Sequence, residues 1–485
     1  MRVLYIDVDS LRPDHLGCYG YERRTSPHID ALAAGGTRCT GCYATDAPCL
    51  PSRTALWSGR LGIHTGVVGH GGTAADPVVQ GARRGFTSAI GEGAWMAALR
   101  RAGLRTATVS TFGERHSAFH WYAGFHEIYN HGTRGAEQAH EVLPYALHWL
   151  ERWARHEDWF LHVNLWDPHT PYRVPPEQGE PFAADPPPAW LNQAVLDGHR
   201  AGFGPHGARE PQGLGLGRPG ADWPRMPQEI ATLQDWKRWI DGYDTGIRYA
   251  DRHIGVLLDA LERHGIADQT LIVLSADHGE NQGELNIYGD HQTADECTCH
   301  VPLVVSGPGI ARGHVDPGLH CQLDLAPTVC ELAGARPGRG WDGRSFAAAL
   351  RGGDAGRDHV VLSQGAWACQ RGVRWEHWLL LRTYDPGLKD LAPLLLFDLE
   401  ADPHETRDLC SARPAEVRQG QALLEGWLAE QAIGSPLEAD PLQTVLREGG
   451  PFHTRGQLEP YCARLRATGR AQHAERLLAT GGRGW

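Results

Sequence analysis

Residues 3–9 read Val-Leu-Tyr-Ile-Asp-Val-Asp, and this stretch decides the class of fold. Apolar and β-branched residues run without a turn residue until Pro13, a pattern typical of a buried central strand. Further runs of this kind, which we predict to be strands, lie at 104–110, 159–165, 270–276 and 301–306. The chain therefore contains several segments that, like residues 3–9, predict buried strands.

Helical patterns lie between the predicted strands. The clearest covers 247–261, where apolar residues recur on one helical face, and others lie at 139–154 and 94–101. Strands that alternate with helices indicate an α/β fold with a large, mostly parallel sheet sandwiched by helices. We expect residues 1–355 to form this domain.

Chemically reactive side chains follow three of the predicted strands. Asp7 and Asp9 end the first strand, His169 follows another in the segment Asp167-Pro168-His169, and Asp277 and His278 follow a third. Ligands of such sheets bind beyond the carboxyl ends of the strands. We expect these side chains to meet at one edge of the sheet.

The rest of the chain is organised differently. Residues 174–224 are rich in Pro, Gly and Ala and predict a long surface excursion. Residues 356–433 predict a smaller α+β subdomain, a small sheet with a helix at 414–431. Residues 434–485 predict a helical tail, with an amphipathic pattern around 457–478, that we interpret as an arm for self-association into a homo-oligomer.

Composition excludes several classes of protein. A formal net charge of -12 argues against a nucleic-acid-binding protein. No apolar run is long enough to span a membrane or to form the core of a secretory signal. The eleven cysteines are odd in number and scattered, so they do not predict a disulfide framework. We expect a cytoplasmic protein.

The segment Cys49-Leu50-Pro51-Ser52-Arg53 is the most informative one for chemistry. Proline in a first helical turn places Cys49 at a helix N-terminus, where the positive potential activates a thiol. The alternative is a buried cysteine that happens to precede a helix. Arg53 lies one turn after Cys49 and therefore on the same side of the helix.

The Cys-x-Pro-Ser-Arg segment resembles the signature of type I sulfatases, in the alkaline phosphatase superfamily. Further segments resemble the family in the same order: VLYIDVDSLRPDHLGCYG, TSPHIDALAAGGTRCTGCYA, SGR, DPHTPY, YDTGIRYADRHIGVLLDALE, LIVLSADHGE, VPLVVSGPG, DLAPTVCELAG and LFDLEADPHETRDL. The resemblance covers roughly the first 410 residues and implies an alkaline phosphatase-like fold. An ordered combination of motifs is far more specific than any one of them.

The resemblance implies hydrolysis of sulfate monoesters, with small molecules or saccharides as substrates. A maturation enzyme would oxidise Cys49 to formylglycine, whose hydrate is the family's nucleophile. Asp9, Asp277, His278 and the modified Cys49 would bind one divalent metal ion. Ca²⁺ is the expected ion, with Mn²⁺ or Mg²⁺ as alternatives.

The remaining site residues fall into two groups by expected role. Arg53 would stabilise the nucleophile and the metal cluster. His169 would bind the ester oxygen or act as general acid, and His291 is the candidate for protonating the leaving group. The residues expected to line the substrate pocket are Thr111, His70 and His64.

The chain also departs from the family pattern. Ser10 stands where many sulfatases have a second aspartate, and Ser110-Thr111-Phe112-Gly113 replaces a Gly-Lys-x-His string. These differences are similar to phosphonate monoester hydrolases, which share the Cys-x-Pro-x-Arg motif and cleave phosphonate monoesters and phosphodiesters. An inactive anion-binding relative is a further alternative. A phosphatase with a Ser or Thr nucleophile is disfavoured by Cys49.

Overall fold

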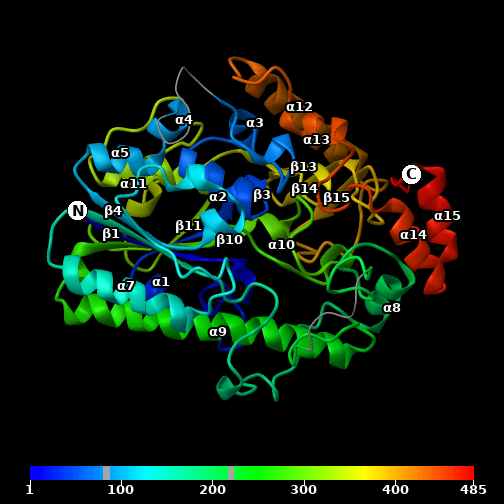
Figure 1. Ribbon diagram of the computed structural model, residues 1–485, viewed down its shortest axis with the longest axis horizontal. Helices are drawn as coiled ribbons and strands as arrows, with labels where there is room; N and C mark the ends of the chain where they lie inside the picture. The colour runs from blue at the N-terminus through cyan, green and yellow to red at the C-terminus, as the bar shows by residue number, and fades with distance from the viewer. Residues whose placement is uncertain (80–87, 217–222, 355, 485) are drawn as a thin grey trace.

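The computed structural model describes residues 1–79, 88–216, 223–354 and 356–484. Its main sheet has eight strands in the order β11-β2-β10-β7-β1-β6-β4-β5 (Figure 1). Their bounds are β1 Arg2–Val8, β2 Thr37–Tyr43, β4 Arg105–Val109, β5 Glu127–Tyr129, β6 Trp159–Leu165, β7 Thr270–Ser275, β10 His300–Ser306 and β11 His314–Cys321. Only β10 runs antiparallel to its neighbours, β2 and β7, so the prediction of a mostly parallel sheet is confirmed.

Helices cover both faces of this sheet, as Figure 1 shows. One face carries α1 (Pro27–Ala34), α7 (Ala139–Trp153) and α9 (Leu233–Arg263). The other carries α2 (Cys49–Ser58), α5 (Trp95–Arg101) and α11 (Leu325–Leu332). Strand β1 lies between β6 and β7 and is almost wholly buried, which explains its unbroken apolar sequence.

A second sheet of five strands lies beside the first, in the order β15-β14-β13-β12-β3. Its strands are β3 Asp46–Ala47, β12 His359–Gln364, β13 Cys369–Trp375, β14 Trp378–Asp385 and β15 Leu394–Asp398, and α12 (Pro414–Ala432) packs on it. The short β3 pairs in parallel with β12 and ends two residues before Cys49. The chain therefore enters α2 directly from the second sheet. One strand of this sheet, β3, comes from the N-terminal part of the chain.

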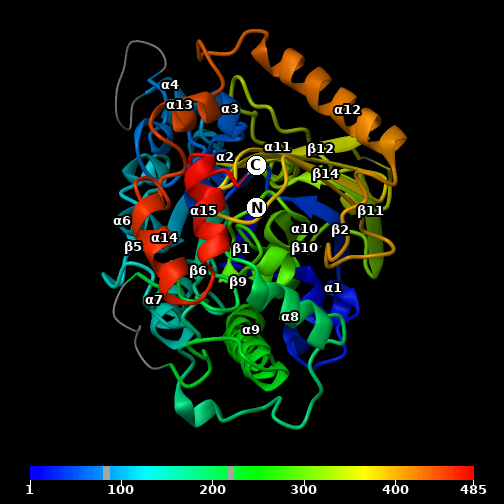
Figure 2. The same cartoon turned by 90° about the vertical axis from the view of Figure 1, so that its right-hand side faces the viewer.

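The C-terminal tail forms two helices after α13 (Pro441–Arg447), where the sequence pattern suggested one. These are α14 (Leu458–Ala467) and α15 (Ala471–Ala479), separated by Gly469 at φ +76° (Figure 2). Their apolar faces pack on Phe203 of the excursion and Leu388 of the second-sheet region. The tail thus packs on its own chain.

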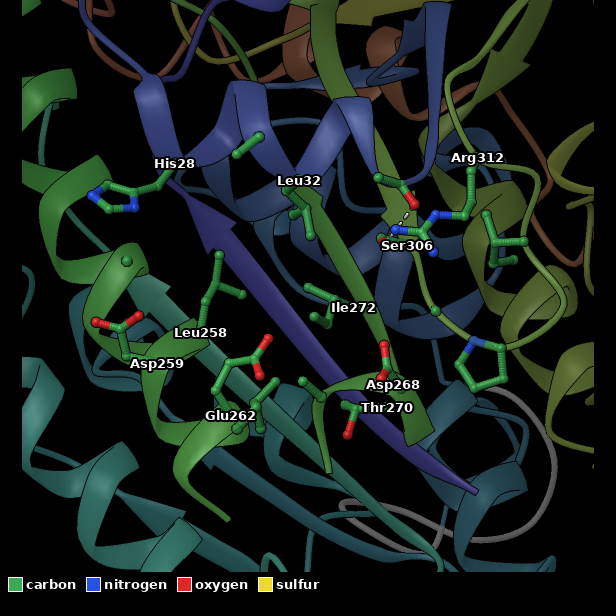
Figure 3. A pocket seen from close by; sticks show the side chains of 18 of the residues that line it. His28, Leu32, Leu258, Asp259, Glu262, Asp268, Thr270, Ile272, Ser306 and Arg312 are labelled. Carbon is green, nitrogen blue, oxygen red and sulfur yellow. Dashed lines mark hydrogen bonds between the residues drawn. The ribbon is translucent and has the colours of Figure 1, made fainter. Parts of the chain in front are cut away.

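Over the described residues, no helix combines the length and apolarity that crossing a membrane requires. A surface cavity of about 590 Å³ lies between α1, α9 and the beginning of β7 (Figure 3). His28, Glu262 and Arg312 are among its lining residues, and the described residues that line it include none of the predicted site residues. This cavity is at the opposite end of β7 from Asp277.

Candidate active site

Three chain segments meet around Cys49. Cys49 is the first residue of α2, Asp9 follows β1, and Asp277 and His278 follow β7. The Sγ atom of Cys49 lies 3.1 Å from Nε2 of His278. One donor atom from each of these four buried residues lies within 4.8 Å of the others. The structure thus brings together all four residues predicted to bind metal.

Arg53 joins these carboxylates from the next turn of α2. Its Nε donates to Asp277 Oδ2 at 3.0 Å, its Nη2 donates to Asp9 Oδ2 at 3.1 Å, and its Nη1 donates to Asp7. The guanidinium is buried and lies over the ring of Phe112 at 5.3 Å. Asp7 Oδ2 also lies 3.2 Å from His162 Nε2. Asp7 thus contacts Arg53 and His162, and it does not belong to the group of four donors.

The charges of this group suit a bound cation. Burial raises the pKa of Asp277 to about 6, and the nearby Asp9 carboxylate adds to the increase, although Arg53 opposes it. For Asp9, burial opposes ionisation, but His169 and Arg53 hold its pKa below the usual range. Two packed carboxylates, an imidazole and an oxygen or sulfur at position 49 match the donors of a divalent metal ion. The residues present therefore fit such an ion.

Two further predicted histidines, His291 and His169, lie close to this group, and a nitrogen of His291 lies within 4.8 Å of Cys49 Sγ. The ring of His291 lies 4.0 Å from that of His278 and 5.8 Å from that of His169. Among the residues that the structure describes, the buried Nδ1 of His291 has no hydrogen-bond partner. Burial lowers the pKa of His169 to about 4 and that of His291 well below its usual range, so both rings are neutral at pH 7.

Sequence reasoning missed Arg115 and His116, which follow strand β4 in and after the short helix α6 (Phe112–Arg115). Arg115 Nη2 lies 3.4 Å from His169 Nε2, and its guanidinium lies over Trp166 at 5.0 Å. A nitrogen of His116 lies within 4.8 Å of Cys49 Sγ. The signal was available, because a cation and an imidazole occur just beyond the position of the missing Gly-Lys-x-His string.

Thr111 is engaged elsewhere. Its hydroxyl donates to Glu137 and accepts from Gly135 N at 2.9 Å, so it fixes the segment before α7. We expected Thr111 to take the place of the missing lysine. Both of these hydrogen bonds direct its hydroxyl toward residues 135–137 instead. We therefore leave Thr111 out of the proposed site and assign the cationic position to Arg115.

His64 and His70 have different surroundings. His64, in α3 (Gly62–Thr65), is bonded to Asp342 Oδ2 at 2.8 Å and to the carbonyl of Gln431 at 3.0 Å. The bond to Gln431 joins α3 to the end of α12, so we also leave His64 out of the site. One nitrogen of His70, in contrast, lies within 4.8 Å of Cys49 Sγ.

Comparisons with known proteins agree with this geometry. A family model described as Sulfatase matches residues 2–335. The chain is 33% identical over 199 residues to choline-sulfatase of Rhizobium meliloti (strain 1021), a match that spans 39% of this chain and 36% of the relative. It is 25% identical over 471 residues to arylsulfatase A of Homo sapiens, covering 84% of this chain and 83% of the relative.

Solved structures show the same fold. A protein in complex with its substrate D-glucosamine-2-N,6-O-disulfate superimposes with a TM-score of 0.71 at 19% identity, over 90% of this chain and 99% of that one. Phosphonate monoester hydrolase of Agrobacterium radiobacter gives 0.67 at 22% identity, over 89% and 95%. From the family match and the relatives, the chain belongs to the sulfatase family of sulfuric ester hydrolases.

Proposed function

We propose that the chain hydrolyses sulfate monoesters with residue 49 as the nucleophile, after conversion of Cys49 to formylglycine by a maturation enzyme. The observation that carries the proposal is the meeting of Cys49 with Asp9, Asp277 and His278 at one end of the sheet. A simple apolar side chain would fill any structural role at position 49 as well as an oxidisable thiol beside two carboxylates and an imidazole.

Asp9, Asp277, His278 and residue 49 would hold one divalent ion. When bound, this ion neutralises substrate charge and acidifies an oxygen at neutral pH. Ca²⁺ is the first candidate because carboxylate oxygens are hard ligands, and Mn²⁺ or Mg²⁺, which also accept oxygen ligands, are alternatives. Ser10 supplies no carboxylate, and its hydroxyl donates to Asp9 Oδ1 at 2.9 Å. The cage therefore has one acidic ligand fewer than many sulfatases.

The chain's own residues would perform the remaining tasks. Arg53 holds the carboxylates in place, because it is bonded to Asp7, Asp9 and Asp277 at once. Arg115 would attract the negative oxygens of the ester. His291 would donate a proton to the leaving alcohol and His169 would hydrogen-bond the ester, since an anion beside either ring raises its pKa toward neutrality.

Saccharide sulfates are one class of candidate substrate. An N-acetylglucosamine-6-O-sulfatase of Bacteroides thetaiotaomicron is 22% identical to this chain over 524 residues. The second candidate function is hydrolysis of phosphonate monoesters or phosphodiesters by the same nucleophile. The serine at position 10 and the absence of the lysine favour it, and so does the structural likeness to phosphonate monoester hydrolases.

A comparison of hydrolysis rates tests which of the two candidate functions the chain has. Protein coexpressed with a maturation enzyme is given an aryl sulfate, a phosphonate monoester and a phosphodiester that share one leaving group. We expect the highest kcat/KM for the sulfate. A higher value for either phosphorus substrate would replace the first function by the second. No turnover of any of them, with Cys49 converted, would favour the inactive relative.

A further inference from the structure

The C-terminal tail contacts His70, a residue that lies beside Cys49. Between α13 and α14 the chain passes beside the active site, where His453 N donates to the carbonyl of Ala366 at 3.1 Å. The ring of Phe452 lies so close to Gly71 that a Cβ atom there would be 2.3 Å from it. This segment is therefore held against the second sheet and against the loop that carries His70.

His453 makes a specific contact at this place. Its Nε2 lies 3.0 Å from Nδ1 of His70. The ring of His453 also stacks on Trp367, with centroids 4.4 Å apart and an interplanar angle of 21°. The stacking fixes the orientation of the His453 ring, and the hydrogen bond then fixes the orientation of the His70 ring.

His70 also lies beside residue 49. Its Nε2 atom is buried and has no hydrogen-bond partner in the described part of the chain, and the same is true of Nε2 of His116. Cys49, His70 and His116 each offer a ligand atom within 4.8 Å of the others. A buried polar atom without a partner costs free energy, so it points to a group that the bare cysteine does not supply.

A hydrogen bond between two imidazoles needs one donor and one acceptor. If His70 donates through Nδ1, its Nε2 carries a lone pair. Arg53 and Arg115, which act on residue 49 electrostatically, can only donate, and one oxygen each of Asp9 and Asp277 already accepts from Arg53. An imidazole nitrogen would therefore add an acceptor for a hydroxyl on residue 49.

We propose that His453 is a positioning residue of the active site: it accepts a hydrogen bond from Nδ1 of His70 and so directs the Nε2 lone pair of His70 at residue 49. The tail is in consequence a part of the active site. The inference rests on the proposed function only for the hydroxyl that residue 49 would carry, because the paired imidazoles exist in the unmodified chain.

The direct test uses the full chain with Cys49 left as cysteine. Long-range ¹H–¹⁵N spectra of histidine-labelled protein report which nitrogen of each ring carries the proton. We expect His70 to be protonated at Nδ1, and to lose this single tautomer in His453→Ala. A His70 protonated at Nε2 in the native chain would overturn the proposal, as would a spectrum that His453→Ala leaves unchanged.

Two further variants separate positioning from folding. His453→Gln retains an acceptor oxygen near His70 and should restore the Nδ1 tautomer. His473→Ala is the matched control, because His473 also lies in the tail but bonds the carbonyl of Ala201. It should leave His70 unchanged. Loss of the tautomer in all three variants would mean a general loss of tail packing and would contradict a specific role for His453.

Kinetics of the matured enzyme provide the second measurement. His453→Ala should lower kcat about 10- to 100-fold with little change in KM, as expected for a residue that orients another, and His453→Gln should recover most of the loss. Equal kcat in His453→Ala and the native enzyme would contradict the proposal. If the native enzyme cleaves no sulfate ester, the proposed function fails, whereas the tautomer measurement still decides this inference.

Discussion

Arg53 is the residue on which the geometry of the site depends most. It is buried and is bonded to three carboxylates from the ends of β1 and β7. Removing one partner of a buried charge cluster leaves the others uncompensated. The same residue therefore contributes to both stability and activity.

Arg53→Ala should lower the free energy of unfolding by about 3–5 kcal/mol, because Asp7, Asp9 and Asp277 lose their shared counter-charge. Arg53→Lys should lose less, since an ammonium group keeps the charge but cannot bond all three carboxylates. Urea unfolding followed by circular dichroism measures both. Equal stability of Arg53→Ala and the native protein would show that the carboxylates do not need this residue.

Cys49→Ser should abolish turnover while leaving the fold intact. A serine at position 49 cannot become formylglycine in a maturation system that acts on cysteine, and it cannot discharge a sulfate ester by the same elimination. The thermal midpoint should stay close to that of the native protein, because the two side chains are nearly equal in size. Repeated turnover by this variant would remove the proposed chemistry.

Arg115→Gln should lower kcat/KM for a sulfate ester by about 10²- to 10³-fold, because a donor aimed at the ester oxygens is lost. Thr111→Val is a matched comparison from the same segment. It removes the hydroxyl that bonds Glu137 and should affect stability more than KM. A larger effect on KM from Thr111→Val than from Arg115→Gln would support Thr111 as the substrate-binding residue.

The sequence predicted that Asp9, Asp277 and His278 would lie together, as they do in the structure, and it did not point to Arg115. Asp9, Asp277 and His278 directly follow apolar strands, so their position at one edge of the sheet follows from the parallel topology. Arg115 is the last residue of the short helix α6, whose direction no local pattern determines. The approach of Arg115 to His169 depends on how α6 packs, which is a property of tertiary structure.

At the scale of elements, the tail and the excursion stabilise each other. Glu210 is buried and is bonded to Arg470, while Arg464 Nε lies 3.2 Å from Glu210 Oε1. These bonds connect the excursion to the turn between α14 and α15. The contact explains why the Pro- and Gly-rich excursion has a defined position around Glu210.

Glu210→Ala should weaken docking of the tail by about 3–5 kcal/mol, since the buried Arg470 would lose its counter-charge. Limited proteolysis should then cut between α13 and α14 faster than in the native protein. Arg466→Ala, which removes an exposed ion pair with Glu475, is the control and should not change the cleavage rate. The same rate in all three proteins would contradict the docking role.

Elements with a strong period were predicted well, and those without one were not. The predicted helix at 139–154 is α7, whereas the predicted 247–261 is only the second half of α9. The first half of α9 carries Trp, Gly and charged residues, and Gly242 allows Tyr172 and Arg225 to approach closely. Tertiary packing there overrides the weak local pattern.

For the whole molecule, Lys389 connects the second-sheet region to the excursion. It is buried, and its Nζ donates to the carbonyl of Pro205 at 3.0 Å. Burial lowers the pKa of Lys389 to about 7, although Asp290 opposes the decrease. An unfolded lysine keeps its proton up to about pH 10.4, so between the two values the unfolded chain binds more protons than the folded one.

The free energy of unfolding of the native protein should therefore rise with pH relative to Lys389→Met, by up to about 1.4 kcal/mol per pH unit between about pH 7 and 10. At pH 7 the methionine variant should be the more stable, because it carries no buried charge. Urea unfolding of both proteins at several pH values provides the comparison. A difference that does not change with pH would show that Lys389 keeps its proton in the folded state.

The layered architecture was predictable because strands and helices alternate along residues 1–355. The relation between the two sheets was not, since β3 is only two residues long and pairs with β12, more than 300 residues later. That long-range pairing sets the position from which α2 and Cys49 approach the main sheet.

The central claim is that residue 49 works as formylglycine together with Asp9, Asp277 and His278. Mass spectrometry of the peptide that contains residue 49, from protein made with and without a maturation enzyme, measures the converted fraction of each sample. We predict that turnover of an aryl sulfate rises in proportion to this fraction and vanishes when it is zero. Full activity in a sample whose Cys49 is an unmodified thiol would contradict the account.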